Sequence, residues 1–152
     1  MVTVELQYAV PQKALPTQAQ FQAWADVIKT RDGETQIAAI RVVNEQEMTV
    51  LNKQYRQKKG PTNVLSFPAQ LHEQVDVPFI GDIVICAPIV INEAKQQHKT
   101  EESHWAHMTV HGILHLQGYD HINDADAMQM ESLEIQIMHQ LGYENPYLAH
   151  VE

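Results

Sequence analysis

The sequence predicts a single α/β (α+β) domain spanning residues 1–152, in which a small, mostly parallel mixed sheet of about four strands is covered by about five helices. Three observations predict this class. The chain has 152 residues, the length of one domain. Apolar segments of strand character alternate with segments of helical periodicity in the first half, whereas the second half is mainly helical. No repeat, low-complexity run or Gly/Ser linker divides the chain.

The first half of the chain alternates between strand and helix patterns. Apolar and polar residues alternate over 2–7, as in a half-buried strand. A helix is predicted over 17–33, beginning at a threonine N-cap and ending at an Asp-Gly turn. Residues 36–43 (QIAAIRVV) predict a second strand. An Asn-x-x-Glu spacing then predicts the start of a helix over 44–56.

The second half predicts two more strands and then three helices. A short β-prone segment covers 64–67, and the nearly continuous apolar run 79–87 (FIGDIVICA) predicts a strand buried on both faces. Helices are predicted over 88–98, over 101–117 and from 124 to a glycine stop at 142. In the last helix the side chains expected to face the core are Met128, Leu133, Ile135, Ile137 and Met138.

The composition excludes several classes of protein. Hydrophobic residues make up 44% and charged residues 19%, which is typical of a folded globular chain and not of a disordered or fibrous one. No run approaches the ~20 apolar residues of a membrane span, and the N-terminus lacks the pattern of a signal peptide, so we expect a cytoplasmic protein without membrane contact. Cys86 is expected to be a buried thiol in a reducing compartment. A net charge of −9 argues against a surface coated with positive charge but not against a local basic patch.

Histidine is concentrated in one short segment. Five of the nine histidines fall between positions 104 and 121. His111 and His115 are four residues apart, which on a helix places both imidazoles on one face about 6 Å apart. Gly118 can end the helix in a left-handed conformation and return the chain, so that His121 reaches the same ion. Three imidazoles with an open fourth position are typical of catalytic zinc, so we predict a zincin-like hydrolytic site for Zn²⁺, with nickel or another divalent ion as an alternative occupant.

A protease pattern is close to this segment but incomplete. His111, His115, Gly118 and His121 match the spacing of the metzincin motif H-E-x-x-H-x-x-G-x-x-H. The residue after the first histidine is Gly112, where those proteases carry the glutamate that acts as general base. A metal-dependent protease or another small-substrate hydrolase therefore stays open as an alternative that would need a different base.

The segment 111–121 (HGILHLQGYDH) resembles the HGxLHLxGYDH signature of the bacterial YbeY family of zinc-dependent endoribonucleases. Four further segments resemble the family in the same order along the chain: 55–56 (YR), 61–68 (PTNVLSFP), 81–83 (GDI) and 141–143 (LGY). The resemblance implies a single-strand-specific metallo-endoribonuclease that acts in maturation of the 3′ end of small-subunit (16S) ribosomal RNA and in ribosome quality control. It also implies single-stranded ribosomal RNA, the small ribosomal subunit, a small-subunit ribosomal protein and a ribosome-associated GTPase as partners.

The same resemblance implies roles for individual residues. The metal triad of the family corresponds to His111, His115 and His121, and its functional arginine corresponds to Arg56. Under this assignment the ion lowers the pKa of a bound water or polarises a phosphoryl oxygen, and Arg56 donates hydrogen bonds to the charge that develops on the phosphodiester. A metal-activated hydroxide and a 2′-hydroxyl of the substrate both stay open as the nucleophile.

Other charged residues near these positions suggest supporting roles. Asp120 is expected to orient a ligand histidine or, alternatively, to accept a proton, and Asp82 is expected either to orient a ligand in the same way or to cap backbone amides. His107 is expected to pack or hydrogen-bond beside the triad, because a helix rises about 12 Å between positions 107 and 115, and His104 is expected at the surface. A run of basic residues is commonly a solvated face, but the family resemblance implies that those flanking Arg56 in this otherwise acidic chain bind phosphates, namely Lys53, Lys58 and Lys59.

A non-catalytic alternative also stays open, in which the chain is a ribosome-assembly factor whose zinc is structural. Loss of a ligand would then unfold the protein, because structural zinc supplies folding free energy. A catalytic site predicts instead that loss of one ligand, for example in His115→Ala, leaves a folded and inactive protein.

Overall fold

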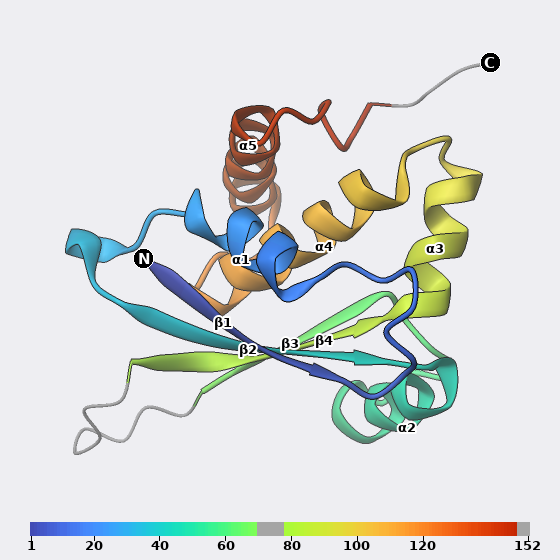
Figure 1. Cartoon of the computed structure of the whole chain (residues 1–152). Coiled ribbons are helices and arrows are strands. Elements are labelled where there is room, and N and C mark those ends of the chain that lie inside the picture. Colours follow the sequence, from blue (N-terminus) through green and yellow to red (C-terminus); the bar gives the residue numbers. More distant parts are fainter. Residues whose placement is uncertain (70–77, 149–152) are drawn as a thin grey trace.

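The computed structural model describes residues 1–69 and 78–148 (Figure 1). Over these residues the four strands and five helices confirm the predicted α+β class. The elements follow in the order β1 (Val2–Tyr8), α1 (Gln18–Asp26), a 3-10 turn (Arg31–Gly33), β2 (Gln36–Val43), α2 (Glu45–Arg56), β3 (Val64–Pro68), β4 (Phe79–Cys86), α3 (Ala87–Gln96), α4 (Glu101–Leu116) and α5 (Asp124–Gln140).

The sheet is mixed and mostly parallel, as predicted. Its strand order is β1-β2-β4-β3. β1 pairs with β2 and β2 pairs with β4 in parallel, whereas β3 lies antiparallel to β4 at one edge, with Ser66 opposite Ile83. Because successive side chains of a strand point to opposite faces, Ile83 and Ile85 of β4 face one layer of helices, and Val84 and Cys86 face the other.

Helices cover the two faces of the sheet unequally. Figure 1 shows α1, α4 and α5 on one side of the sheet and α2 on the other. The larger core lies on the first side, where eleven of the sixteen residues of α4 are buried between the sheet and α5. The smaller core packs Met48 of α2 against Val84 and Cys86, and Cys86 is fully buried as predicted. In residues 1–69 and 78–148, no helix is long and apolar enough to cross a membrane.

The helix starts follow the predicted capping residues, but the first helix is shorter than predicted. The Thr17 side chain accepts a hydrogen bond from the Gln20 amide, and the Gln20 side chain accepts one from the Thr17 amide, which completes a capping box. α1 nevertheless ends at Asp26, well before the Asp-Gly turn. Ile28 extends the apolar periodicity because it packs into the core from a non-helical turn, at 3% exposure.

The face that α5 turns to α4 differs in part from the predicted one. Met128 is 69% exposed, so its expected place in the core is wrong, whereas Met130 is buried. Glu134 lies in the same buried stripe and is only 1% exposed. When only apolar residues are used to assign the buried face of a helix, a face that includes a carboxylate is assigned incorrectly. Of the other predicted core positions, Leu133 and Ile135 are half-buried, and Ile137 and Met138 are buried.

α4 packs unusually close to the sheet at Gly112. A Cβ atom placed there would lie 2.8 Å from Cγ2 of Ile83, which is itself fully buried. Glycine is therefore the residue that allows this helix to approach β4. The contact fixes which face of α4 is turned to the sheet, and His111 and His115 lie on a different, partly exposed face.

Candidate functional site

Three imidazoles converge where α4 ends. The Nε2 atoms of His111 and His115 are 3.1 Å apart. The ring of His121 lies 5.8 Å from that of His111 and 5.1 Å from that of His115, centroid to centroid. One nitrogen from each ring lies within 4.8 Å of the others. The structure thus brings together the three histidines that the spacing predicted.

A glycine turn returns the chain so that His121 reaches the other two. Gly118 has φ +104, and a Cβ there would meet no atom within 4 Å, so the requirement for glycine is conformational and not steric. The amides of Gly118 and Tyr119 donate to carbonyls in the last turn of α4. Asp120 Oδ1 then accepts a hydrogen bond from the His121 amide at 2.8 Å, which holds the loop in place before α5 begins.

The donor set fits a divalent metal ion. Two nitrogens that each lie 2.0–2.1 Å from one tetrahedral ion are about 3.3 Å apart, close to the separation found for His111 and His115. Burial and the two neighbouring imidazoles lower the pKa of His115, which favours the neutral ring whose lone pair binds metal. The His121 side chain is 55% exposed, compared with 19% for His115, so one side of the cluster is open to solvent. An open side is typical of catalytic and not of structural zinc sites.

The histidines line a polar cleft of about 640 Å³ that also contains Arg56. Arg56 is the last residue of α2, and the left-handed C-cap at Gln57 turns the chain there. β3 forms another wall, and the Ser66 hydroxyl donates to the Gly112 carbonyl. The residues that line the cleft are Arg56, Asn63, Val64, Ser66, Pro68, His111, His115, Gly118, Tyr119, Asp120 and His121.

The other predicted residues lie at different distances from this cleft. Asp120 lines it, with Oδ1 3.8 Å from Nδ1 of His121 and 4.0 Å from Nδ1 of His115. Both distances exceed a hydrogen bond, so the carboxylate acts on these rings through its charge. The basic residues that flank Arg56 are exposed and are not among the lining residues: Lys53, Lys58 and Lys59.

Asp82 lies on the wrong face of the sheet for its expected role. Its neighbours Gly81 and Ile83 contact α4, so the Asp82 side chain points to the opposite face. There it lines a separate groove with Arg41 and Tyr55, and partial burial raises the pKa of its carboxyl. The expectation that Asp82 orients a ligand histidine is therefore wrong. Side chains of a strand alternate between the two faces of a sheet, but both faces are apolar in this strand. The sequence pattern therefore does not indicate to which face Asp82 points.

A buried glutamate of α5 is shared by two histidines of α4, one of which is the triad member His111. His107 is buried, as expected of a packing residue, and its Nε2 lies 2.5 Å from Oε2 of Glu134. The same oxygen lies 3.3 Å from Nδ1 of His111. Burial alone would raise the pKa of Glu134, but the hydrogen bonds from the two histidines outweigh it and lower this pKa to about 2. Glu134 was not predicted to contribute to the site; its signal was a charged residue in the apolar stripe of α5.

His104 is also buried, and its expected surface position is wrong. Only 3% of the residue is exposed, and its Nε2 lies 2.9 Å from Oε1 of Glu93 on α3. The Asn63 side chain donates to the same carboxylate. These hydrogen bonds outweigh burial and lower the pKa of Glu93. The partner comes from a separate helix, which the spacing of residues within α4 does not reveal.

Two comparisons with known proteins name the same family, and a third finds a solved structure with a similar fold. The family model described as Endoribonuclease YbeY matches residues 7–142. A curated protein named Endoribonuclease YbeY, from Nitrosococcus oceani, is 49% identical over 148 residues, which are 96% of this chain and 97% of that relative. The solution structure of TM1509 from Thermotoga maritima matches with a TM-score of 0.61 and 26% identity, covering 93% of this chain and 89% of that one. The chain therefore belongs to the endoribonuclease YbeY family, as its motifs indicated.

Proposed function

We propose that this chain is a metal-dependent endoribonuclease that cleaves single-stranded RNA, and that residues 1–152 form the one domain that carries this activity. The observation that carries the proposal is the convergence of three imidazoles and one guanidinium on a single polar cleft. Endoribonuclease is the activity named for the family and for the relative from Nitrosococcus oceani.

His111, His115 and His121 would hold the ion, which we propose to be Zn²⁺, with nickel as the alternative. Imidazole nitrogens suit both metals, and availability often decides between them. A bound ion supplies Lewis acidity beside the scissile phosphodiester. The exposed position of His121 leaves room for an RNA strand to reach that point of the cleft.

The remaining polar residues of the cleft bind and orient the substrate. Arg56 presents a planar fork of donors, which matches two phosphate oxygens and stabilises the charge that grows on them during cleavage. Asp120 accepts a hydrogen bond from the His121 amide and so holds the loop that carries His121. The negative charge of Asp120 also favours the correct orientation of the neighbouring imidazoles. The identity of the nucleophile stays open between a water and the 2′-hydroxyl of the RNA.

We further propose that the substrate is ribosomal RNA of the small subunit, at or near the 3′ end of its 16S species, and that the protein acts in the cytoplasm. A small-subunit ribosomal protein and a ribosome-associated GTPase would recruit it there, since a chain of net charge −9 has little long-range attraction for RNA. Phosphates on either side of the cleavage point would contact the basic residues that flank the cleft, Lys53, Lys58 and Lys59.

The two alternatives have less support. A protease of the metzincin type needs a glutamate at position 112, but this position faces Ile83 in the core, where a Cβ atom alone would lie 2.8 Å from Cγ2 of Ile83. Asp120 is the single carboxylate among the described residues that line the cleft. An assembly factor with structural zinc would be expected to close the ion with a fourth protein ligand, whereas this cluster has an open side.

The test compares wild-type protein with His115→Ala and with His139→Ala, a matched exposed histidine on α5 outside the cleft. Metal content, cleavage of a single-stranded 16S 3′-end RNA and circular dichroism are measured on all three. We expect one ion per chain and metal-dependent cleavage in the wild type and in His139→Ala, with both lost in a folded His115→Ala protein. Cleavage by a folded, metal-free His115→Ala protein would refute the proposal, and an unfolded one would favour the structural-zinc alternative.

A further inference from the structure

A buried carboxylate connects the candidate metal centre to residues 141–148, which follow α5 and are called the C-terminal segment below. Glu134 is only 1% exposed and receives hydrogen bonds from two directions. From α4, Nε2 of His107 lies at 2.5 Å and Nδ1 of His111 at 3.3 Å from its Oε2 atom. From the C-terminal segment, the Tyr147 hydroxyl donates to both carboxylate oxygens at 2.9 Å.

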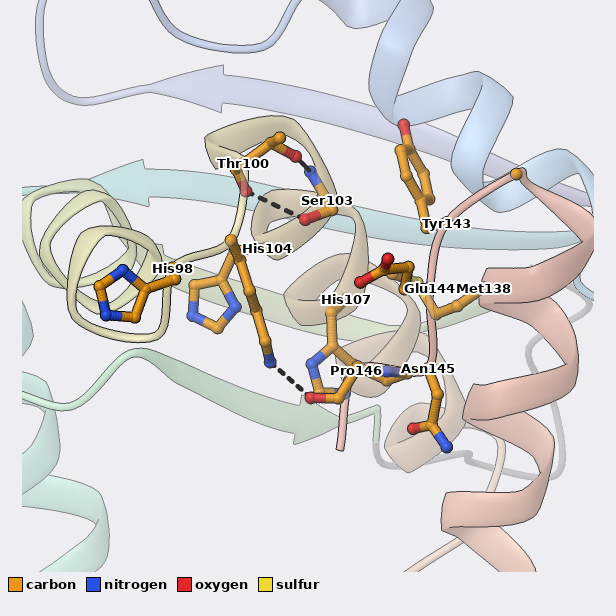
Figure 2. Close-up of a pocket in the computed structure, with 12 residues that line it drawn as sticks. His98, Thr100, Ser103, His104, His107, Met138, Tyr143, Glu144, Asn145 and Pro146 are labelled. Atoms are coloured by element: carbon orange, nitrogen blue, oxygen red, sulfur yellow. Dashed lines mark hydrogen bonds between the residues drawn. The ribbon is translucent and has the colours of Figure 1, made fainter. Parts of the chain in front are cut away.

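The C-terminal segment is held against α4 by further contacts. The Tyr147 ring meets the His107 ring edge to face, with centroids 5.3 Å apart. The Lys99 ammonium donates to the Pro146 carbonyl. Figure 2 shows Asn145 and Pro146 of this segment around one cavity with His104 and His107 of α4. The Tyr147 hydroxyl is thus fixed in position by its own segment and not only by Glu134.

The cluster of His107, His111 and Glu134 is a hydrogen-bonded set and not a second metal site. Two ligand atoms of one tetrahedral ion lie about 3.3 Å apart, whereas the His107 nitrogen and the Glu134 oxygen are 2.5 Å apart. His107 and Glu134 are also too buried for an ion to keep any water ligand. The contact between His107 and Glu134 is a short hydrogen bond from a ring N–H to a carboxylate oxygen.

A carboxylate that receives three donors fixes the proton positions on both imidazoles. An ionised carboxylate only accepts hydrogen bonds, so the ring nitrogens that face it must carry hydrogen. His107 faces Glu134 with Nε2, and His111 faces it with Nδ1. With one hydrogen on each ring, the two imidazoles are therefore opposite tautomers on one carboxylate. In His111 this leaves Nε2 without a hydrogen, so in the metal-free protein its lone pair accepts the 3.1 Å hydrogen bond from Nε2 of His115, and the same lone pair can bind an ion instead.

We propose that Glu134 is a positioning residue that fixes His111 in its Nδ1–H tautomer, and that Tyr147 holds Glu134 in place for this task. The effect of Glu134 on metal binding rests on the proposed function, whereas the position of the hydrogen on the His111 ring does not. A carboxylate behind a ligand imidazole orients the ring and raises its basicity, and removing such a partner costs 10- to 100-fold in metal affinity in other sites. The C-terminal segment thereby becomes part of the metal centre without touching the ion.

The first experiment assigns the tautomers in metal-free wild-type protein by long-range ¹⁵N–¹H NMR correlations of the histidine rings. The expected result is Nδ1–H for His111 and Nε2–H for His107. An Nε2–H tautomer at His111 would overturn the proposal. Because no metal is present, this result is independent of whether the protein cleaves RNA: the predicted tautomers in a protein that binds no zinc would support the tautomer assignment and refute the metal function alone.

The second experiment measures zinc affinity by competition with a chelator in folded variants. Glu134→Gln keeps the shape of the side chain but loses its charge, and we expect a 10- to 100-fold weaker Kd. Tyr147→Phe should weaken zinc binding in the same direction by a smaller factor, and should broaden the His111 Nδ1–H resonance through faster exchange with water. Tyr143→Phe is the matched control: its hydroxyl contacts Glu102 and Trp24 and lies outside the Glu134 set. Equal effects of the two tyrosine variants, or an unchanged Kd in Glu134→Gln, would contradict the proposed role.

Discussion

Replacement of Gly112 by alanine tests the packing that positions α4, the helix that carries His111 and His115. In a helix interior, glycine to alanine normally raises the free energy of unfolding by about 1 kcal/mol. At position 112 the new Cβ would lie 2.8, 3.0 and 3.1 Å from three side-chain carbons of Ile83, which is fully buried and has no solvent to move into. Overpacking of this kind costs about 1–3 kcal/mol. We therefore expect Gly112→Ala to lower the free energy of unfolding by about 1 kcal/mol and the Tm by about 3 °C.

Urea unfolding followed by circular dichroism measures this change, and a double-mutant cycle identifies its cause. Ile83→Ala alone should cost about 2–5 kcal/mol because it leaves a cavity. In the double variant the methyl group at position 112 fills part of that cavity, so the destabilisation should be smaller than the sum of the two single effects by about 1 kcal/mol or more. An increase in stability for Gly112→Ala, or additive effects in the cycle, would refute the close contact between α4 and β4.

Three further outcomes are expected. Glu93→Gln should lower the free energy of unfolding by about 1–2 kcal/mol at pH 7. His104 lowers the pKa of Glu93 below its ordinary value of 4.5, so the stabilisation from this pair is complete above pH 4.5 and is lost as pH falls through the lowered pKa. The difference in free energy of unfolding between wild type and variant, measured by urea titration, should therefore become smaller as pH falls below 4.5. A difference that stays constant with pH would contradict the pairing. Arg56→Lys should keep metal content and fold but lower kcat/KM for RNA cleavage at least tenfold, because an ammonium has no planar fork; unchanged kinetics would remove Arg56 from the reaction. Replacing Lys53, Lys58 and Lys59 together by alanine should reduce the slope of log affinity against log salt concentration by about 0.7 for each phosphate that is no longer neutralised. Filter-binding of single-stranded RNA at several salt concentrations measures this slope.

The parts of the fold that could be predicted from the sequence are those with a local cause. Strand alternation at 2–7, the capping threonine at 17 and the turn glycine at 118 each act within a few residues of the chain, and all three are found in the structure. The convergence of His111 and His115 is equally local, because one helical turn separates them. Local rules therefore predicted the histidine cluster and most helix starts.

The parts that could not be predicted depend on which element packs against which. Glu93 and Glu134 reach the histidines of α4 from other helices, and the register between two helices has no signature within either one. The side of the sheet to which Asp82 points depends on strand parity in a segment that is apolar on both faces. In each case the missing information is tertiary, and the sequence signal was only a polar residue in an otherwise apolar pattern.

The histidines of α4 differ in burial although their spacing is similar, and this difference separates the proposed metal ligands from the packing residues. His104, His107, His111 and His115 form one continuous stripe, and a carboxylate from another element lies near each of them. Side-chain exposure rises along the stripe from 4% and 9% at the first two to 21% and 19% at the last two. Among the described residues, His104 and His107 each keep a buried Nδ1 atom without a hydrogen-bond partner. Side-chain exposure therefore distinguishes the two histidines proposed as metal ligands from the two that pack, and it is greater towards the end of the helix that precedes Gly118.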